Sequence, residues 1–224
     1  MNIVKAESLY KNYKLGKTLV PALNGVDITV EKGEFLAIAG PSGSGKTTFL
    51  NLISGIETPT SGKIFIDDIE LSSLSADALA DIRARKIGFV FQNFNLLPVL
   101  TAIENVEYPL LLTNRVQQKE TRRIAERALE MVGLSKFGCH KPLELSGGQR
   151  QRVAIARAIV IKPSVILADE PTANLDHKTG EEILNLMKKI NQDEKTTFIF
   201  STHDAKVMSM ATRVIKLWDG AVVK

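Results

Sequence analysis

The stretch "EFLAIAGPSGSGKTTFLNLISG", Glu34–Gly55, decides the fold of this chain. Its first part, Phe35–Ala39, is almost wholly apolar and predicts a strand buried on both faces, as in a parallel sheet covered by helices. The next residues, Gly40–Thr47, match the phosphate-loop pattern G-x-x-x-x-G-K-[ST], and the run after them predicts a helix that ends at Gly55. Since a buried strand precedes the loop and a helix follows it, the sequence predicts an α/β protein with a site for the phosphates of a nucleotide.

The residue types in this loop suit a phosphate ligand. Glycines allow a tight turn whose N–H groups surround phosphate oxygens, Lys46 reaches the β and γ oxygens, and the hydroxyl of Thr47 is placed to bind Mg²⁺. A turn that only connects a strand to a helix does not require Lys and Thr at these positions. The predicted nucleotide-binding residues of the loop are Gly40, Pro41, Ser42, Gly43, Ser44, Gly45, Lys46, Thr47 and Thr48.

Apolar runs elsewhere predict the other strands and a long helical interval. Strand-like stretches occupy the N-terminal part, and further candidates lie at 62–67, 86–91, 164–169, 196–201 and 213–218. No strand is predicted between residues 92 and 164. Within this interval, residues 117–132 show the amphipathic pattern typical of a surface helix, whereas the run from Val153 is apolar nearly all round and predicts a buried helix.

The expected fold class is therefore α/β, with a P-loop (RecA-like) core, an N-terminal antiparallel β-subdomain and an inserted α-helical subdomain. All 224 residues are expected to form a single domain. In this division, residues 1–92 and 160–224 supply the core with its β-subdomain, and residues 93–159 supply the helical subdomain.

Candidate catalytic side chains follow three of the predicted strands. Asp169 ends the strand 164–169 and suits a Mg²⁺ shell, while Glu170, on the emerging loop, can orient an attacking water or take a proton from it. Gln92 and His203 also come just after strands, where the amide of Gln92 can contact Mg²⁺ or water and His203 can hydrogen-bond a γ-phosphate oxygen. Open α/β sheets bind ligands beyond the carboxyl ends of their strands, so we expect these side chains near the phosphate loop.

Composition limits the partners and the compartment. Lys and Arg total 29 against 25 Asp and Glu, for a net charge of +4, and no basic block dominates, so no nucleic-acid partner is predicted. No apolar run approaches the roughly 18 residues that span a bilayer, and the N-terminus lacks the apolar segment of a signal peptide. Together with the single cysteine, Cys139, this predicts a reducing, cytoplasmic location.

The stretch "LELSGGQRQRVAIARAIV", Leu143–Val160, predicts a second site for an anion. Ser146, Gly147 and Gly148 open a strongly helical run, and bare N–H groups at such a start suit a phosphate. The phosphate loop surrounds its ligand from one side, so this second set of N–H groups can cover the exposed face of a γ-phosphate. The sequence itself leaves open whether the two sites meet within one chain or between two.

The order of these motifs resembles the ATP-binding subunit of ATP-binding-cassette (ABC) transporters. The resemblance covers essentially the whole chain, and it rests on GPSGSGKT (40–47), Gln92, LSGGQ (145–149), ILADE (166–170), NLD (174–176) and THD (202–204). The stretches "GFVFQNFNLLPVLTAIENVEYPL" and "GGQRQRVAIARA" are similar to the lipoprotein-releasing and macrolide-export group. The sequence departs from the family's commonest pattern at Asn174 and at Arg150.

The resemblance implies a role for each side chain near the phosphates. Glu170 would be the catalytic base and His203 the switch histidine, and Gln92 would be the third catalytic residue. Mg²⁺ would be bound by Thr47, Gln92 and Asp169.

The resemblance also implies how ATP is enclosed. Tyr13 would stack on the adenine ring, with Tyr10 as the alternative. Two cassettes of this family pair head to tail with two ATP molecules between them, and Asp176 would lie at their interface. The residues that would contact the ATP of the second copy are Ser146, Gly147, Gly148 and Gln149.

The function implied is that of an ATP hydrolase coupled to transmembrane movement of a substrate. As an ATP-sandwich homodimer, the chain would power a separate integral-membrane permease from the cytoplasmic face of the cell (inner) membrane, for lipoprotein release or for macrolide or peptide export. The alternative is a non-transport ATPase of the same branch that acts on a membrane partner in cell division or cell-wall remodelling. A P-loop kinase is disfavoured by LSGGQ, and a switch GTPase by the lack of N-K-x-D after the loop.

The apolar residues that follow Gln92 have two interpretations. Phe94, Leu97 and Leu100 line a groove for a cytoplasmic helix of the permease, or they are ordinary core residues of the helical subdomain. The sequence does not identify the transported substrate, because the permease would select it.

Overall fold

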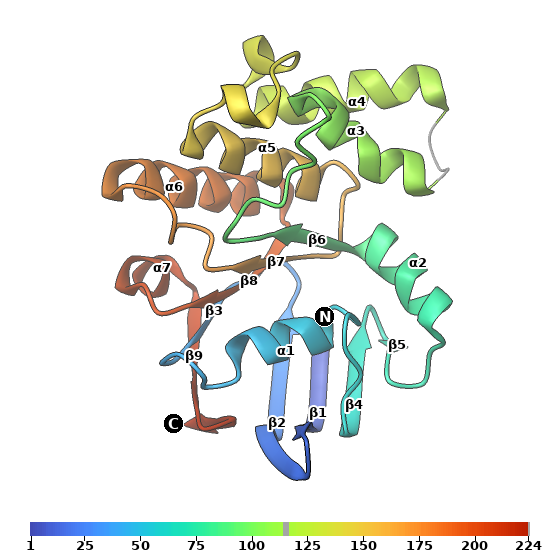
Figure 1. Cartoon of the computed structure of the whole chain (residues 1–224), viewed down its shortest axis with the longest axis vertical. Coiled ribbons are helices and arrows are strands. Elements are labelled where there is room, and N and C mark those ends of the chain that lie inside the picture. Colours follow the sequence, from blue (N-terminus) through green and yellow to red (C-terminus); the bar gives the residue numbers. More distant parts are fainter. Residues whose placement is uncertain (114–116, 224) are drawn as a thin grey trace.

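A computed structural model describes residues 1–113 and 117–223 of the chain. In this part of the chain, one sheet has four strands in the order β2-β1-β4-β5, and the other has six in the order β10-β9-β3-β8-β7-β6. Figure 1 shows the smaller sheet in the lower half, the larger sheet across the middle and a group of helices above it. This architecture confirms the predicted α/β class.

The strands are β1 (Asn2–Leu15), β2 (Thr18–Glu31), β3 (Phe35–Ala39), β4 (Ser61–Ile66), β5 (Ile69–Glu70), β6 (Ile87–Val90), β7 (Val165–Asp169), β8 (Thr197–Thr202), β9 (Arg213–Trp218) and β10 (Ala221–Val223). The α-helices are α1 (Lys46–Ile53), α2 (Ala76–Lys86), α3 (Ala102–Thr113), α4 (Gln118–Met131), α5 (Gly147–Ile159), α6 (His177–Glu194) and α7 (Ala205–Met210). Two short 3-10 helices are η1 (Ser135–Phe137) and η2 (Pro142–Glu144).

Five strands of the larger sheet are parallel to one another, namely β9, β3, β8, β7 and β6. β3 pairs in parallel with β8 and β9, and β7 pairs in parallel with β8 and β6, while β10 closes the other edge antiparallel to β9. The carboxyl ends of β3, β6, β7 and β8 consequently meet at one edge of the sheet. The candidate catalytic residues follow these strand ends, so the topology brings distant parts of the sequence to one place.

The two faces of the larger sheet belong to two separate hydrophobic clusters. Along β8, Phe198 and Phe200 pack in the cluster that includes α3 to α6, whereas Ile199 packs in the cluster that includes α1 and the smaller sheet. Successive residues of a strand point to opposite faces, so a strand covered on both sides must be apolar at nearly every position. For this reason, unbroken apolar runs in the sequence predict the strands of the larger sheet.

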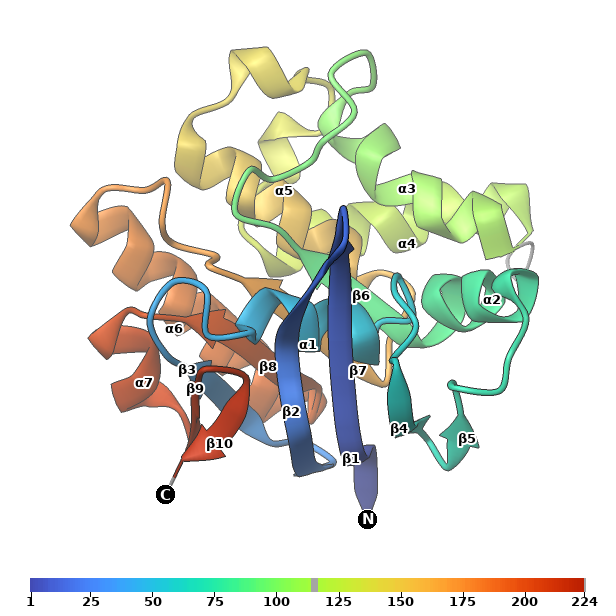
Figure 2. The ribbon, with the colours of Figure 1, turned by 60° about the horizontal axis from the view of Figure 1, so that its bottom comes forward.

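The helices of the upper part are α3, α4 and α5. α4 spans Gln118–Met131, close to the surface helix predicted at 117–132. α5 begins at Gly147, ahead of the apolar run that predicted it, and packs against β6 and α6 as well as against α3 and α4. Figure 2 shows α3, α4 and α5 grouped together again, in the upper part of the molecule. The division of the chain at residues 93 and 159 stays a prediction.

Gly88 lets β6 approach α5. A Cβ atom on Gly88 would lie 2.6 Å from the carbonyl oxygen of Ala158, which belongs to the backbone of α5. Gly88→Ala therefore forces the strand and the helix apart, and we expect the free energy of unfolding to fall by about 3 kcal/mol in urea titrations.

Gly138→Ala is the matched control. A Cβ atom at Gly138 meets its nearest neighbour, a side-chain atom of Leu129, at an ordinary 3.6 Å. We expect its unfolding midpoint to stay close to that of the unmodified chain. Equal stabilities of the two variants would contradict the close β6–α5 contact.

Candidate functional site

The phosphate loop connects β3 to α1 and is held by close contacts on both sides. A Cβ atom on Gly40 would lie 2.3 Å from the carbonyl oxygen of Leu217, and one on Gly45 would lie 2.6 Å from that of Ala22. Gly43 and Gly45 also have φ angles of 80° and 99°, which side chains rarely adopt. No side chain caps the N-terminus of α1, so its N–H groups face the loop as an anion site requires.

Lys46 is directed back over the loop. Its Nζ donates hydrogen bonds of 2.8 Å to the carbonyl oxygens of Gly40 and Pro41, and the residue is only 7% exposed. A lysine ammonium has three N–H donors, so one remains for another acceptor. The cation is therefore fixed above the loop with a donor available to a phosphate.

Thr47 and Asp169 meet at the start of α1. The Thr47 hydroxyl lies 3.4 Å from Oδ1 of Asp169, which ends β7. A hydroxyl and a carboxylate oxygen are ligands that suit Mg²⁺, which commonly completes its shell with water and nucleotide phosphates. Within residues 1–113 and 117–223, no group of three or more His, Cys, Asp or Glu side chains suits a metal ion. A Mg²⁺ ion at Asp169 therefore requires oxygens from a phosphate or water.

Glu170 and His203 form a second polar pair at the same sheet edge. Nδ1 of His203 lies 2.6 Å from Oε1 of Glu170. The backbone of Glu170 has φ = 46°, an unusual left-handed conformation for this residue type, and its N–H donates to the carbonyl oxygen of Ser201 at 2.9 Å. Backbone strain of this kind persists where surrounding contacts impose it, and it recurs at functional sites. The sequence placed Glu170 on a loop but gave no sign of this conformation.

Gln92 is exposed, and its backbone is tied to the loop that follows Glu170. Nδ2 of Asn174 donates to the carbonyl oxygen of Gln92 at 3.0 Å and to Oδ1 of Asn93 at 2.7 Å. Asn174, which departs from the commonest family pattern, therefore links two of the candidate motifs within one chain.

Arg157 of α5 holds the next two residues of the same loop. Phe94 and Asn95 have φ angles of 61° and 47°, and the Arg157 guanidinium donates to their carbonyl oxygens at 2.8 and 2.5 Å. Burial lowers the pKa of Arg157 to about 10, so the side chain stays charged at neutral pH. Arg150 of the same helix lies 5.1 Å from the ring of Phe94. Sequence reasoning missed Arg157, although an arginine inside an apolar helix was a usable signal.

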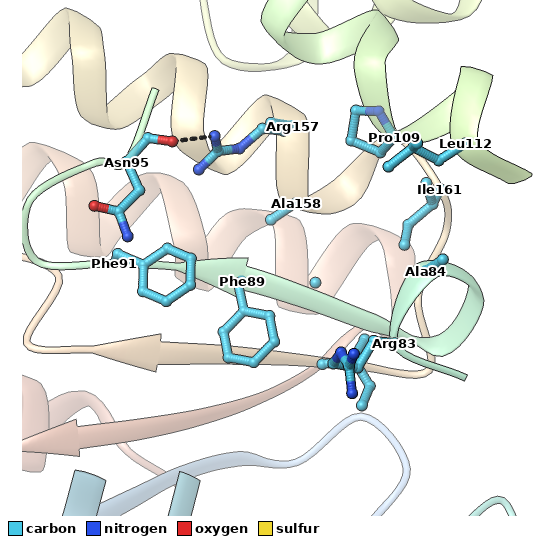
Figure 3. A pocket seen from close by; sticks show the side chains of 12 residues that line it. Arg83, Ala84, Phe89, Phe91, Asn95, Pro109, Leu112, Arg157, Ala158 and Ile161 are labelled. Carbon is cyan, nitrogen blue, oxygen red and sulfur yellow. Dashed lines mark hydrogen bonds between the residues drawn. The ribbon is translucent and has the colours of Figure 1, made fainter. Parts of the chain in front are cut away.

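A mainly apolar cavity of about 210 Å³ lies beside this loop. Figure 3 shows that its lining comes from β6, the loop after it, α2, α3 and the end of α5. Its apolar lining includes Phe89, Phe91, Pro109, Leu112 and Ile161. The dashed line in Figure 3 marks the bond from Arg157 to Asn95 at one end of the cavity.

The predicted groove at Phe94, Leu97 and Leu100 does not coincide with this cavity. None of the three residues lines it. The ring of Phe94 packs under Arg150, and Leu97 is 39% exposed outside the cavity. The backbone of Phe94 is left-handed, with φ = 61°, which local sequence could not reveal.

Ser146 begins α5 as a capping residue. Its Oγ accepts from the N–H of Gln149 at 3.2 Å, and the side chain of Gln149 accepts from the Ser146 N–H at 2.9 Å. Gly147 and Gly148 pack against Leu175 and Thr179, where a Cβ atom would lie 3.3 and 2.5 Å from side-chain atoms. The LSGGQ segment therefore packs against the loop before α6 and against the first turn of α6.

The LSGGQ segment and the phosphate loop lie apart within the chain. Figure 1 shows the start of α5 in the upper group of helices and the loop ahead of α1 in the lower half of the molecule. Among the hydrogen bonds of the described residues, none joins 146–149 to 40–48. One chain does not bring its two predicted phosphate sites together.

Tyr13 lies at the side of α1, next to the phosphate loop. Its hydroxyl donates to Oε2 of Glu57 at 2.7 Å and has the Thr48 side chain as a further hydrogen-bonding neighbour. Burial and this bond to Glu57 raise the pKa of the Tyr13 hydroxyl. Tyr10, the alternative for adenine stacking, packs over Gly25 instead, where a Cβ atom would lie 2.8 Å from its hydroxyl oxygen.

A parallel sheet with a phosphate loop between β3 and α1, and with carboxylates at the neighbouring strand end, defines a P-loop nucleotide-binding protein. The sequence model of the family described as "ABC transporter" matches residues 23–173. The chain belongs to this family and is an ABC transporter ATP-binding subunit of the group that includes LolD and MacB. The predicted resemblance is confirmed.

Three relatives show how far the similarity extends. The uncharacterized ABC transporter ATP-binding protein MJ0796 of Methanocaldococcus jannaschii is 48% identical over 98% of this chain and 95% of that protein. The lipoprotein-releasing system ATP-binding protein LolD of Legionella pneumophila is 43% identical, over 98% of this chain and 96% of LolD. The macrolide export ATP-binding/permease protein MacB of Syntrophobacter fumaroxidans is 44% identical over 99% of this chain but only 31% of MacB.

The fold also matches a solved structure of one relative. The dimeric post-hydrolysis structure of the cassette MJ0796, bound to ADP and Pi, superposes with a TM-score of 0.90 and covers 99% of this chain and 97% of that one. Among the residues that our structure describes, no helix has the length and apolar character needed to cross a membrane.

Arg157→Met should destabilise the chain. The substitution leaves the carbonyl oxygens of Phe94 and Asn95 without their donor, and two residues in left-handed conformations lose their support. We expect the free energy of unfolding in urea to fall by about 2 kcal/mol.

The control is Arg123→Met on the surface of α4. Among the described residues, Arg123 pairs only with Glu120, at 3.6 Å, and its side chain is 63% exposed. Removing such a pair should change stability by less than about 0.5 kcal/mol. If Arg123→Met lowered the free energy of unfolding as much as Arg157→Met, the effect of Arg157→Met could not be assigned to the hydrogen bonds with Phe94 and Asn95.

Proposed function

We propose that this chain binds Mg²⁺ and ATP at the phosphate loop, hydrolyses the ATP, and thereby powers a separate integral-membrane permease from the cytoplasmic face of the cell (inner) membrane. Lipoprotein release or export of a macrolide or peptide is the proposed output. The observation that carries the proposal is the meeting of two polar pairs, Thr47–Asp169 and Glu170–His203, at the sheet edge beside Lys46.

The residues divide the work of hydrolysis. Lys46 and the N–H groups of the loop hold the phosphates, and Thr47 and Asp169 hold Mg²⁺, with Gln92 as a further ligand. When bound, Mg²⁺ neutralises charge that develops on the phosphate oxygens. Glu170 takes a proton from the attacking water or orients it. A neutral imidazole has one N–H, so His203 donates either to the Glu170 carboxylate, whose Oε1 lies 2.6 Å from its Nδ1, or, as the other tautomer, to a γ-phosphate oxygen.

The second phosphate site acts between two copies of the chain. Ser146, Gly147, Gly148 and Gln149 lie away from the phosphate loop of their own chain. The N–H groups of Ser146 and Gln149 are engaged in the capping box, so those of Gly147 and Gly148 would be the donors to the ATP of a partner copy. MJ0796, whose fold matches this one, was solved as a dimer. ATP would then hold the two copies together, and hydrolysis would release them. The chain would therefore alternate between two states, an ATP-bound dimer and separate copies. Tyr13 supports the site from the side by stacking on adenine.

The permease docks at the cavity beside the Gln92 loop. The cavity is apolar, borders the helical group and has Asn95 at its end, so a bound helix would press on the segment that carries Gln92. Because the side chain of Asn174 donates to the backbone of Gln92, a displacement of the Gln92 segment would also move the loop after Glu170. MacB carries an ATP-binding and a permease part in one protein, which supports a permease as the partner here.

A second candidate is a non-transport ATPase of the same branch, acting on a membrane partner in cell division or cell-wall remodelling. The same site and cavity would serve it, and isolation of the complex from membranes distinguishes the two. A partner that transports nothing would favour this alternative.

Glu170→Gln tests the catalytic base. The amide keeps the size of the side chain but cannot take a proton, so ATP binding should persist while turnover falls by about 10²-fold or more. The ATP-bound dimer should then accumulate and be detected by size-exclusion chromatography.

Glu181→Gln, on an exposed face of α6 where Glu181 pairs with Lys206, is the control and should hydrolyse ATP normally. Full turnover by Glu170→Gln would rule out Glu170 as the base.

Ser146→Arg tests whether the second site acts between chains. The bulky cation would block the N–H groups at the start of α5, so hydrolysis should fall by about 10²-fold while the monomer binds ATP with unchanged affinity. Ser135→Arg adds the same charge at an exposed position of η1 and should keep full activity. Loss of ATP binding by the monomeric Ser146→Arg chain would instead place both sites in one chain.

A further inference from the structure

Ser201 in β8 has a hydroxyl group without a partner. The residue is 0% exposed, and its Oγ makes no hydrogen bond to the part of the chain that the structure describes. Buried hydroxyl groups in proteins are nearly always hydrogen-bonded, because losing water without gaining another partner is unfavourable. The serine therefore needs an explanation other than packing.

Ser201 lies beneath the pair formed by Thr47 and Asp169. β8 runs between β3 and β7, where the register pairs Ser201 with Ile38 on one side and with Asp169 on the other. Paired residues of neighbouring strands share a face of the sheet, and Ile38 packs in the cluster that includes α1. The hydroxyl of Ser201 and the carboxylate of Asp169 thus lie side by side under the start of α1.

The main chain of Ser201 already positions the other carboxylate of the site. Its carbonyl oxygen accepts a 2.9 Å hydrogen bond from the N–H of Glu170, whose backbone is left-handed. The carbonyl group of this one residue is thus committed to Glu170, while its hydroxyl lies on the face of Asp169.

We propose that Ser201 is a positioning residue for Asp169, and that its hydroxyl donates a hydrogen bond to the carboxylate oxygen of Asp169 that does not bind the metal ion. This inference rests on the proposed function, in which Asp169 binds Mg²⁺. Groups behind a metal ligand orient it and commonly matter to metal affinity almost as much as the ligand does. When Thr47 is the partner of Asp169, the hydroxyl of Ser201 has none, so it destabilises that arrangement and favours the one with Mg²⁺.

The test compares Ser201→Ala with the unmodified chain by two measurements. Without nucleotide and in EDTA, Ser201→Ala should raise the Tm by about 2 °C, because it removes an unpartnered buried hydroxyl. With saturating ADP, MgCl₂ is then titrated while the rise in Tm is followed. The MgCl₂ concentration at half-maximal rise should increase about tenfold in Ser201→Ala.

Ser54→Ala is the matched control, since Ser54 is 1% exposed but its hydroxyl donates to the carbonyl oxygen of Asn51 at 2.8 Å. This variant should lower the Tm and leave the MgCl₂ titration unchanged. An unchanged half-maximal MgCl₂ concentration in Ser201→Ala overturns the inference, whatever its Tm.

Asp169→Asn separates failure of the inference from failure of the proposed function. The unmodified chain should respond to MgCl₂ and Asp169→Asn should respond only weakly. If both respond alike, or neither responds, the assignment of Mg²⁺ to Asp169 is wrong, and the role of Ser201 is overturned with it.

Discussion

The structure depends on how closely the backbone of the phosphate loop approaches two other strands. At Gly40 the space for a side chain is taken by the carbonyl oxygen of Leu217 in β9, and at Gly45 by that of Ala22 in β2. The loop is therefore pressed between the parallel sheet and the smaller antiparallel sheet. Because of this contact, the smaller sheet is part of the site: it supports the loop and carries Tyr13 to the side of α1.

Around this loop, polar and strained groups are held by elements that are remote in sequence. β8 fixes the left-handed backbone of Glu170, α5 supports the loop after Gln92 through Arg157, and Asn174 joins that loop to the segment before α6. Each contact satisfies a group whose conformation would otherwise be costly. The same contacts connect the cavity beside β6 to the pair of Glu170 and His203, so a partner at the proposed docking site would act through existing hydrogen bonds.

Much of the fold could be predicted because its signals are local. A strand such as Val165–Asp169 is covered on both faces and must be apolar throughout, and the loop at Gly40–Thr47 needs its residue types in a set order. The start of α5 is equally legible, since Ser146 and Gln149 form a capping box within four residues. The two interpretations of Phe94, Leu97 and Leu100, a partner groove or core packing, stay predictions, and none of the three residues lines the cavity beside β6. The left-handed backbone at Phe94 is supported by Arg157 of α5, which is distant in sequence, so no local pattern predicted it.

By itself the sequence determined the α/β class, the phosphate loop, the family and the polar residues that follow the strands. These follow from periodicity and from short motifs, in which each residue is constrained by its neighbours in the chain. Only the tertiary structure decided the backbone of Glu170, the partners of Arg157 and the unpartnered hydroxyl of Ser201. Each of these depends on where backbone atoms from distant parts of the chain come to lie, and local sequence does not encode those positions separately from the fold.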